Sequence, residues 1–331
     1  MDEILKEIGR RERFLIVSHS RPDGDSIGTS LGLGLALEEL GKRVEWIQAD
    51  PPPDLFRFLP GIDRIRISNR AEGAYDALLV LECGAYERTE IQGLDSYFTI
   101  NIDHHPKNDR FGNLNWIDPK AAAVAEMAYR LLKALPAEIS PEVATNLSVG
   151  ILTDTGSFRF ASTTAETFRI ASELVGSGAD PGTISQMLFM NHPASRMRLL
   201  TKLLETLDFT PDGTVSWIHL SQRMLQEAGA SLRDTEGLVN YALGVSGVQV
   251  CAFFREEGRR QYRVSLRAKA DVSADVGQVA ELFGGGGHAK AAGLSVEGEF
   301  EEVRSLVVSR LLETLQAKAL STTGTSGGTP D

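Results

Sequence analysis

The sequence predicts an α/β protein, with a parallel β-sheet in its first half and a smaller α/β domain after it. Apolar, strand-like runs alternate with helix-like runs through the first half, and such alternation is typical of a parallel sheet with helices on both faces. With 331 residues, the chain is long enough for two domains. Hydrophobic residues make up 42% of it, which is enough for an ordinary core in each domain.

The first expected elements follow one another closely. An apolar run at 13–18 predicts a strand, and the apolar run at 26–40 is long enough for a helix. The run at 42–48 predicts a second strand, whose alternation points Val44 and Trp46 inward.

Two more strands and two helices complete the first domain. The runs 76–82 and 97–103 are largely apolar, which indicates parallel strands buried on both faces. Residues 120–135, rich in alanine and leucine, predict a helix, and a second helix begins at Pro141 and ends near Thr153.

A polar stretch after the first strand carries His19, Asp23 and Asp25 within seven residues. Open α/β sheets bind ligands at the carboxyl ends of their strands, where this stretch is expected. Two carboxylates and an imidazole held this close are costly to bury unless a cation lies among them. The alternative is a polar turn in which Asp25 or Ser26 caps the following helix.

The later strand ends carry similar side chains. Glu82 ends one apolar run, and Asp103 ends the next, directly before His104 and His105. Asp154 follows the helix that begins at Pro141. If the strands are neighbours, all of these side chains share one edge of the sheet with the stretch described above. The alternatives are a solvated strand end for Glu82 and a capping role for Asp154.

Composition excludes several classes of protein. A formal net charge of −11 argues against binding of long duplex nucleic acid, which depends on clustered cations. Two cysteines argue against a disulfide framework or a cysteine metal site. The amphipathic N-terminus and the lack of long apolar runs predict a cytoplasmic protein without a signal peptide or membrane span.

The second half begins with helices and continues with strands. We place the end of the first domain at 190, within a helical connector, and the second domain at 210–316. The predicted helices are 165–176, 183–190 and 195–207, and the predicted strands are 214–220, 249–256 and 261–269. The Ser/Thr/Gly-rich residues 321–331 are predicted to be disordered.

A glycine-rich stretch in the second half is a candidate anion-binding loop. Successive glycines let backbone amides approach a ligand closely, and His288 follows directly. A flexible linker would be more polar than the flanking residues. By alternation along the strand 261–269, three polar side chains share one face and could bind a phosphate. The candidate binding residues are Gly284, Gly285, Gly286, Gly287, His288, Arg263, Ser265 and Arg267.

Together, the motifs of the first half resemble the four motifs of the DHH phosphoesterase superfamily. They are His19-x-x-x-Asp23-Gly-Asp25, the strand-terminal acid Glu82, Asp103-His104-His105 and Asp154-Thr-Gly. The resemblance covers about residues 12–160. One position departs from the pattern, because the family commonly has Asp where this chain has Glu82, whose side chain is longer by one methylene group.

The resemblance implies two manganese ions. It assigns His19, Asp23 and Glu82 to the first ion, and Asp25, Glu82, His104 and Asp154 to the second, with Glu82 bridging them. It also implies that His105 contacts the phosphate and that Asp103 orients the histidines. Carboxylate and imidazole ligands suit Mn²⁺, and Mg²⁺ is also compatible with them.

The second half resembles the DHHA1 domain, over about residues 210–315. In that branch of the superfamily, the glycine-rich loop and a nearby arginine bind the nucleotide end of the substrate. In size and domain pairing the chain resembles the group of bifunctional oligoribonucleases and PAP phosphatases (NrnA-like). The resemblance therefore implies a catalytic DHH domain, a substrate-binding DHHA1 domain and an active-site cleft between them.

The expected function is hydrolysis of short single-stranded RNA (nanoRNA) to mononucleotides, of 3′-phosphoadenosine 5′-phosphate (PAP), or of both. A linear or cyclic dinucleotide phosphodiesterase is an alternative, because such a site could accept either substrate. A catalytically weak nucleotide sensor is an alternative of another class, given Glu82 at the bridging position. The sequence does not determine the preferred substrate, the cleavage polarity, the native metal or whether the protein forms a homodimer.

Overall fold

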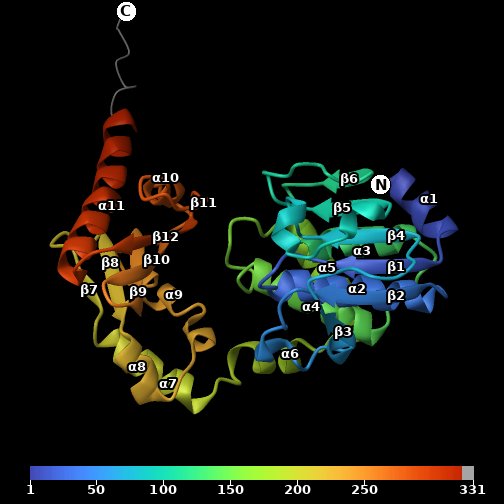
Figure 1. The fold of residues 1–331 in the computed structure, drawn as a ribbon, viewed down its shortest axis with the longest axis horizontal. Helices are drawn as coiled ribbons and strands as arrows, with labels where there is room; N and C mark the ends of the chain where they lie inside the picture. Colours follow the sequence, from blue (N-terminus) through green and yellow to red (C-terminus); the bar gives the residue numbers. More distant parts are fainter. Residues whose placement is uncertain (323–331) are drawn as a thin grey trace, which may run out of the picture. The chain divides into compact units, whose positions relative to one another are not determined.

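The computed structural model describes residues 1–322. The chain separates into two compact units, Met1–Asn191 and His192–Asp331 (Figure 1). Of the tail predicted as disordered (321–331), the first two residues continue a helix and the others lie outside the described residues.

The first unit contains a six-stranded parallel sheet, in the order β3-β2-β1-β4-β5-β6. The strands are β1 (Arg13–Val17), β2 (Arg43–Gln48), β3 (Ile65–Ile67), β4 (Ala77–Leu81), β5 (Thr99–Asp103) and β6 (Leu114–Ile117). The order reverses between β1 and β4, and ligands bind in open α/β sheets at such a reversal. The predicted parallel sheet is confirmed, and the short edge strands β3 and β6 are additions to it.

The α-helices of this unit bury their apolar side chains in one core. They are α1 (Asp2–Arg10), α2 (Gly24–Glu39), α3 (Val124–Ala134), α4 (Pro141–Asp154), α5 (Ala165–Gly176) and α6 (Pro181–Phe189). Phe14 and Ile16 of β1 point into this core. The alternate residues Leu15 and Val17 point into a second core, which loops and 3₁₀ helices cover. The prediction of helices on both faces is therefore wrong for that face.

Helices α2 and α4 cross at very close range. A Cβ atom on Gly28 would lie 2.4 Å from the backbone oxygen of Asn146, so the helices can approach this closely only with glycine there. A Cβ atom on Gly150 of α4 would lie 2.8 Å from Oδ1 of Asp25. The crossing therefore brings the start of α2 beside the end of α4, where Asp154 lies.

The second unit contains a mixed six-stranded sheet, in the order β11-β12-β10-β9-β8-β7. Its strands are β7 (Asp208–Phe209), β8 (Val215–Leu220), β9 (Val250–Gly258), β10 (Gln261–Ala268), β11 (Gly286–His288) and β12 (Ala291–Glu297). Only the β8–β9 pair is parallel among the pairings of this sheet in the described residues.

Helices pack on both faces of this second sheet. They are α7 (Ala194–Leu204), α8 (Gln222–Ala228), α9 (Val239–Leu243), α10 (Val276–Glu281) and α11 (Phe300–Thr322). Side chains of α10 and α11 pack with Val264 and Leu266 of β10 on one face. Leu199 and Leu203 of α7 pack with Ile218 on the other face. The run expected as a connector at 195–207 thus contributes to the core of the second unit.

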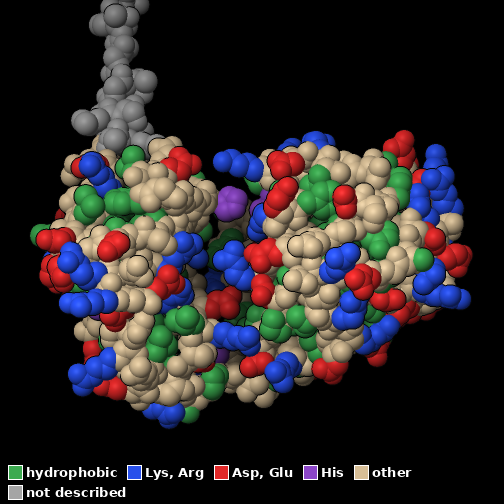
Figure 2. Space-filling view, viewed as in Figure 1, with side chains coloured by type: hydrophobic (Ala, Val, Ile, Leu, Met, Phe, Trp, Pro, Cys, Tyr) green, Lys and Arg blue, Asp and Glu red, His purple; other side chains and the backbone are tan. Residues whose placement is uncertain are grey.

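Charged side chains of both signs are intermixed over the face of each unit that Figure 2 shows. This pattern agrees with the acidic net charge of −11 and offers no broad basic surface on that face for long nucleic acid. Among residues 1–322, no helix combines the length and the apolar character that crossing a bilayer requires.

The α2–α4 crossing predicts the effect of a substitution at Gly28, and Gly9 provides a control. We expect Gly28→Ala to lower the free energy of unfolding by ~1–3 kcal/mol, because its methyl group would force the helix backbones apart. Gly9→Ala, in α1, meets nothing within 4 Å and should raise that free energy by up to about 1 kcal/mol through helix propensity. Urea unfolding followed by circular dichroism measures both. A Gly28→Ala protein as stable as the wild type would show that the two helices can separate without cost.

Candidate metal centre

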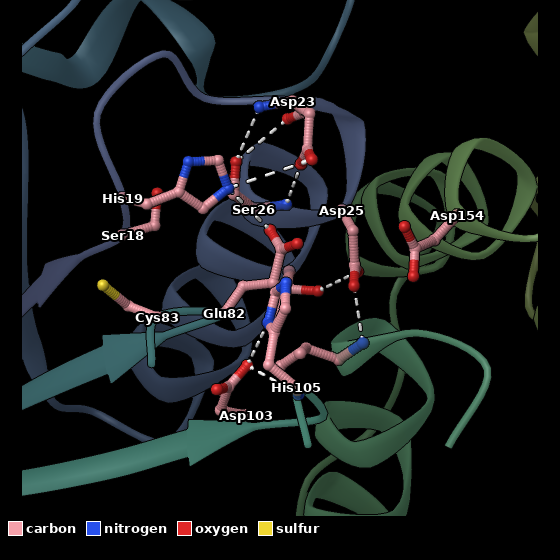
Figure 3. Close-up of polar contacts among 12 residues, drawn as sticks. Ser18, His19, Asp23, Asp25, Ser26, Glu82, Cys83, Asp103, His105 and Asp154 are labelled. Atoms are coloured by element: carbon pink, nitrogen blue, oxygen red, sulfur yellow. Dashed lines mark hydrogen bonds and ion pairs between the residues drawn. The ribbon is translucent and has the colours of Figure 1, made fainter. Parts of the chain in front are cut away.

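Eight polar side chains converge at the carboxyl ends of β1, β4 and β5 and at the facing ends of α2 and α4 (Figure 3). They are the residues predicted from the sequence: His19, Asp23, Asp25, Glu82, Asp103, His104, His105 and Asp154. The structure therefore brings together side chains that are more than a hundred residues apart in the chain.

His19 directs one ring nitrogen at two carboxylates. Its Nε2 lies 3.2 Å from Oε2 of Glu82 and 3.8 Å from Oδ2 of Asp23. Its Nδ1 lies 2.8 Å from the carbonyl oxygen of Ser20, which can only accept, so Nδ1 carries a proton. In the neutral ring, Nε2 then turns a lone pair toward carboxylate oxygens, an arrangement that a cation between them would stabilise.

His104 repeats this arrangement on the other side of the cluster. Its Nδ1 lies 3.1 Å from the carbonyl oxygen of Ala121, and its Nε2 lies 3.4 Å from Oδ2 of Asp154. Histidines that bind metals usually donate their second ring N–H to a carbonyl or carboxylate in this way. Both histidines are therefore oriented as metal ligands would be.

Asp23 begins helix α2. Its side chain accepts a hydrogen bond of 3.0 Å from the backbone N–H of Ser26, and the Ser26 hydroxyl accepts one of 2.9 Å from the N–H of Asp23. The capping alternative had named Asp25 or Ser26 as the cap of this helix. That alternative is wrong for Asp25, because the capping side chain is Asp23, and Ser26 only completes the reciprocal pair.

Asp25 instead binds the start of a different helix. Its two carboxylate oxygens accept hydrogen bonds from the backbone N–H groups of Val124 (2.5 Å) and Ala125 (2.9 Å), at the first turn of α3. The hydroxyl of Thr29 donates a third bond of 2.9 Å. Burial, and then the nearby charge of Asp23, raise the pKa of Asp25 above its ordinary value, although hydrogen bonds and His104 act against the shift.

Glu82 lies at the centre of the cluster. It follows the last residue of β4 and has a φ angle of 55°, which is left-handed and costs a non-glycine residue about 1–3 kcal/mol. The residue is only 3% exposed, so the solvated strand-end alternative is wrong. Burial, followed by the charges of Asp23, Asp25 and Asp154, raises the pKa of Glu82 well above its ordinary value.

Asp103 holds His105 in one orientation. Oδ1 of Asp103 lies 2.8 Å from Nδ1 of His105 and also accepts the backbone N–H groups of His104 and His105. Burial raises the pKa of Asp103, but the hydrogen bonds from His105 and Asn108 outweigh it and leave that pKa below its ordinary value. Asp103 is therefore a carboxylate that receives N–H groups, and Nδ1 of His105 carries the proton between them.

Two asparagines that the sequence analysis missed support this arrangement. Nδ2 of Asn108 donates to Oδ2 of Asp103 (2.7 Å) and to Oδ1 of Asn101 (2.9 Å). Asn101 is fully buried and donates to the carbonyl oxygen of Cys83 (3.0 Å), the residue after Glu82. The network thus connects the turn at Glu82 to the turn at Asp103. A polar residue inside the apolar run 97–103 was the signal that could have revealed Asn101.

The donor atoms of the cluster form three overlapping groups, each within 4.8 Å. The groups are His19, Asp23 and Glu82; Asp25, His104 and Asp154; and Glu82, His104 and His105. Burial and then Asp25 raise the pKa of Asp154 to about 8, while His104 acts in the opposite direction. Neighbouring buried carboxylates repel one another when they ionise, and a divalent cation between them neutralises their charge. The cluster can therefore bind metal, and its oxygen and imidazole donors fit Mn²⁺ or Mg²⁺.

The residues predicted to bind substrate lie in the second unit, on strand β10, on strand β11 and on the two glycines before β11. Tyr262, Val264 and Leu266 face the core. The alternate residues Arg263, Ser265 and Arg267 of β10 therefore share the opposite face, as the alternation predicted.

Strand β12 separates β10 from the glycine-rich residues. Its Ala291 pairs with both Arg267 and His288, and its Gly293 pairs with both Ser265 and Gly286. Small side chains therefore lie between Arg267 on one strand and His288 on the other.

The glycine-rich stretch is partly a strand, which corrects the expectation of a loop. Gly286–His288 form the edge strand β11, paired with β12. A Cβ atom on Gly285 would lie 2.3 Å from the carbonyl oxygen of Gly293, and one on Gly287 would lie 2.5 Å from that of Ala291. Gly285 and Gly287 are thus required for close approach to β12, whereas Gly284 and Gly286 meet nothing within 4 Å.

Comparisons with known proteins agree with the motifs and the geometry. The DHH family, N-terminal domain, matches residues 13–151, and the DHHA1 domain matches residues 215–317. A bifunctional oligoribonuclease and PAP phosphatase NrnA from Thermus thermophilus is 40% identical over 299 residues, covering 89% of this chain and 87% of the relative. A protein of the same name from Bacillus subtilis is 28% identical and covers 89% of this chain and 92% of the relative.

A solved structure shows the same fold over nearly the whole chain. It is an exopolyphosphatase-related protein from Bacteroides fragilis, with a TM-score of 0.86, 28% identity, and coverage of 96% of this chain and 95% of that chain. The sequence matches span both domains, and they agree with the predicted resemblance. The chain belongs to the DHH family of phosphoesterases, in the branch that carries a DHHA1 domain after the catalytic one.

Proposed function

We propose that this protein is a metal-dependent phosphohydrolase that degrades short RNA oligonucleotides to mononucleotides and dephosphorylates PAP. The observation that carries the proposal is the convergence of two ligand groups, one around His19 and one around Asp154, on either side of Glu82. The name of the 40% identical relative, an oligoribonuclease and PAP phosphatase, supports this choice of substrates.

Two divalent cations, Mn²⁺ in the first place, would fill the cluster. His19, Asp23 and Glu82 would hold one, and Asp25, Glu82, His104 and Asp154 would hold the other, with Glu82 shared. When bound, such a pair lowers the pKa of a water molecule and neutralises charge on phosphoryl oxygens. Glu82 differs from the commoner Asp by one methylene group but offers the same carboxylate, and it is buried in the cluster.

His105 would act on the phosphate itself. Because Nδ1 is bonded to Asp103, Nε2 is the atom that can contact a phosphoryl oxygen or pass a proton to the leaving group. The hydrogen bonds from Asn108 and from two backbone N–H groups keep Asp103 in place as the acceptor. His105 is thereby held in one orientation, and it would pass a proton from Nε2 only when both ring nitrogens carry one, a form that the Asp103 carboxylate stabilises.

The domain at 210–316 would bind the nucleotide end of the substrate, while the domain at 1–190 carries the metals. Arg263, Ser265 and Arg267 would contact the phosphate from β10, and residues 284–288 would contact it from β11 and the turn before it. Burial lowers the pKa of Arg267, yet a guanidinium stays charged at neutral pH. Ala291 and Gly293 lie between the two strands, and the guanidinium of Arg263 lies over Gly293.

A product assay tests the proposed function. Purified protein with Mn²⁺ is incubated with RNA of two to ten nucleotides, PAP, cyclic dinucleotides, and duplex RNA as the control. We expect mononucleotides from the shortest RNA and AMP from PAP, little cleavage of longer RNA, and none of duplex. Preferential cleavage of cyclic dinucleotides would instead indicate a dinucleotide phosphodiesterase. Nucleotide binding without product release would indicate a sensor.

Two acidic ligands should respond differently to substitution. Asp154→Asn should abolish metal binding and hydrolysis but should not lower the free energy of unfolding of the metal-free protein, because burial near Asp25 raises the pKa of Asp154 to about 8 and a neutral amide removes that unfavourable charge. Asp25→Asn should abolish both activities and also lower that free energy by ~1–3 kcal/mol, because its amide cannot accept at both oxygen positions. Calorimetric Mn²⁺ titration and thermal unfolding of the metal-free proteins measure these effects. Full metal occupancy in Asp154→Asn would contradict the ligand assignment.

Arg267 should contribute to substrate binding and not to metal binding. We expect Arg267→Ala to lower kcat/KM for a diribonucleotide by roughly 10- to 100-fold, the loss of a charged hydrogen bond to phosphate, with unchanged Mn²⁺ affinity. Arg260→Ala is the matched control, because Arg260 lies next to the far end of β10 and pairs with Glu299. If both variants cleave the diribonucleotide as the wild type does, β10 does not bind the substrate.

A further inference from the structure

The segment after Asp154 carries Phe160, an aromatic residue that is not part of the metal centre described above. Phe160 is 53% exposed, although it lies only six residues from a candidate metal ligand. Its backbone N–H donates to the carbonyl oxygen of Thr155, 3.0 Å away, and the N–H of Arg159 donates to the same oxygen at 2.9 Å. The backbone of Phe160 is therefore bonded to the residue that directly follows Asp154.

The backbone of this segment is strained and well bonded. Ser157 and Phe158 have φ angles of 60° and 63°, which cost roughly 1–3 kcal/mol each for residues other than glycine. The N–H of Ser157 donates to the carbonyl oxygen of Leu152 (2.7 Å), and that of Phe158 donates to the hydroxyl of Thr155 (3.0 Å). Such strain persists where the surrounding structure holds a functional geometry in place.

The two phenylalanines of the segment have different roles. Phe158 packs against the core and stacks on Phe168, with ring centroids 4.9 Å apart. Phe160 lies instead over Gly156, where an added Cβ atom would come within 2.5 Å of the ring. Nε of Arg159 donates to the carbonyl oxygen of Gly156 (2.6 Å). A half-exposed aromatic ring and a cation are thus both anchored on Gly156, two residues from Asp154.

We propose that Phe160 is the stacking surface for the nucleobase of the nucleotide that is being hydrolysed, with Arg159 beside it; this proposal rests on the proposed function. A nucleotide presents a flat base next to an anionic phosphate, and the segment presents a flat ring next to a cation. Stacking on an aromatic side chain accepts every base, which suits an enzyme that shortens RNA of any sequence. It also gives a short substrate an attachment that duplex RNA, with its bases paired and stacked, cannot offer.

The test compares substrates with and without bases. We expect Phe160→Ala to lower kcat/KM for the diribonucleotide ApA by roughly 5- to 150-fold, the range measured when base stacking is removed. Phe160→Trp should keep most of the activity. On an ApA analogue that is abasic at both positions, Phe160→Ala and the wild type should be equally slow. Mn²⁺ affinity and melting temperature should not change.

Phe189→Ala is the matched control, because Phe189 is a 44% exposed aromatic residue at the end of α6, outside the proposed site. It should leave all of these values unchanged. If Phe160→Ala cleaves ApA as the wild type does, or is slowed equally on the abasic analogue, the stacking proposal is overturned. A wild-type protein that cleaves neither ApA nor PAP would overturn the proposed function instead, and the stacking proposal with it.

Discussion

The carboxylate of Asp25 is the interaction on which the rest of the first unit depends. It accepts the first N–H groups of α3 from a position at the start of α2, so it joins two helices that are about a hundred residues apart in the chain. Gly28 and Gly150 bring α4 against the same carboxylate. One buried charge therefore organises the helices and lies in the candidate metal centre, which makes folding and metal binding interdependent.

Several residues around this charge occupy conformations that are unfavourable by themselves. Glu82, Ser157 and Phe158 all have left-handed backbones, and the carboxylates of Glu82 and Asp154 have raised pKa values because they are buried near like charges. Hydrogen bonds from Asn101 and Asn108 hold the turns at Glu82 and at Asp103. The segment after Asp154 is held by its own bonds, from the N–H groups of Ser157 and Phe158. Stability is thus reduced at the site and maintained by the apolar core beneath the sheet.

The second unit places two arginines on a sheet surface, where Arg263 is exposed and Arg267 is half-buried. Arg263 and Arg267 stand on the face of β10 opposite its apolar side chains. Gly285 and Gly287 let the glycine-rich stretch approach β12 closely, while Gly284 and Gly286 leave open space where a side chain would lie. In the proposed function, this surface binds the nucleotide end of the substrate.

The sequence alone determined the strands β1, β2, β4 and β5, the alternation of Arg263, Ser265 and Arg267, and the polar residues at the strand ends. These follow from local periodicity and from the rule that parallel strands end at one edge. Tertiary structure alone decided the short strands β3 and β6, the loops over one face of the sheet, and the edge strand made by Gly286–His288. It also decided that Asp25 binds α3, that Glu82 adopts a left-handed backbone, and that Asn108 supports Asp103. Each of these features depends on a partner that is distant in the sequence. A local pattern of residues does not specify which distant groups it will contact.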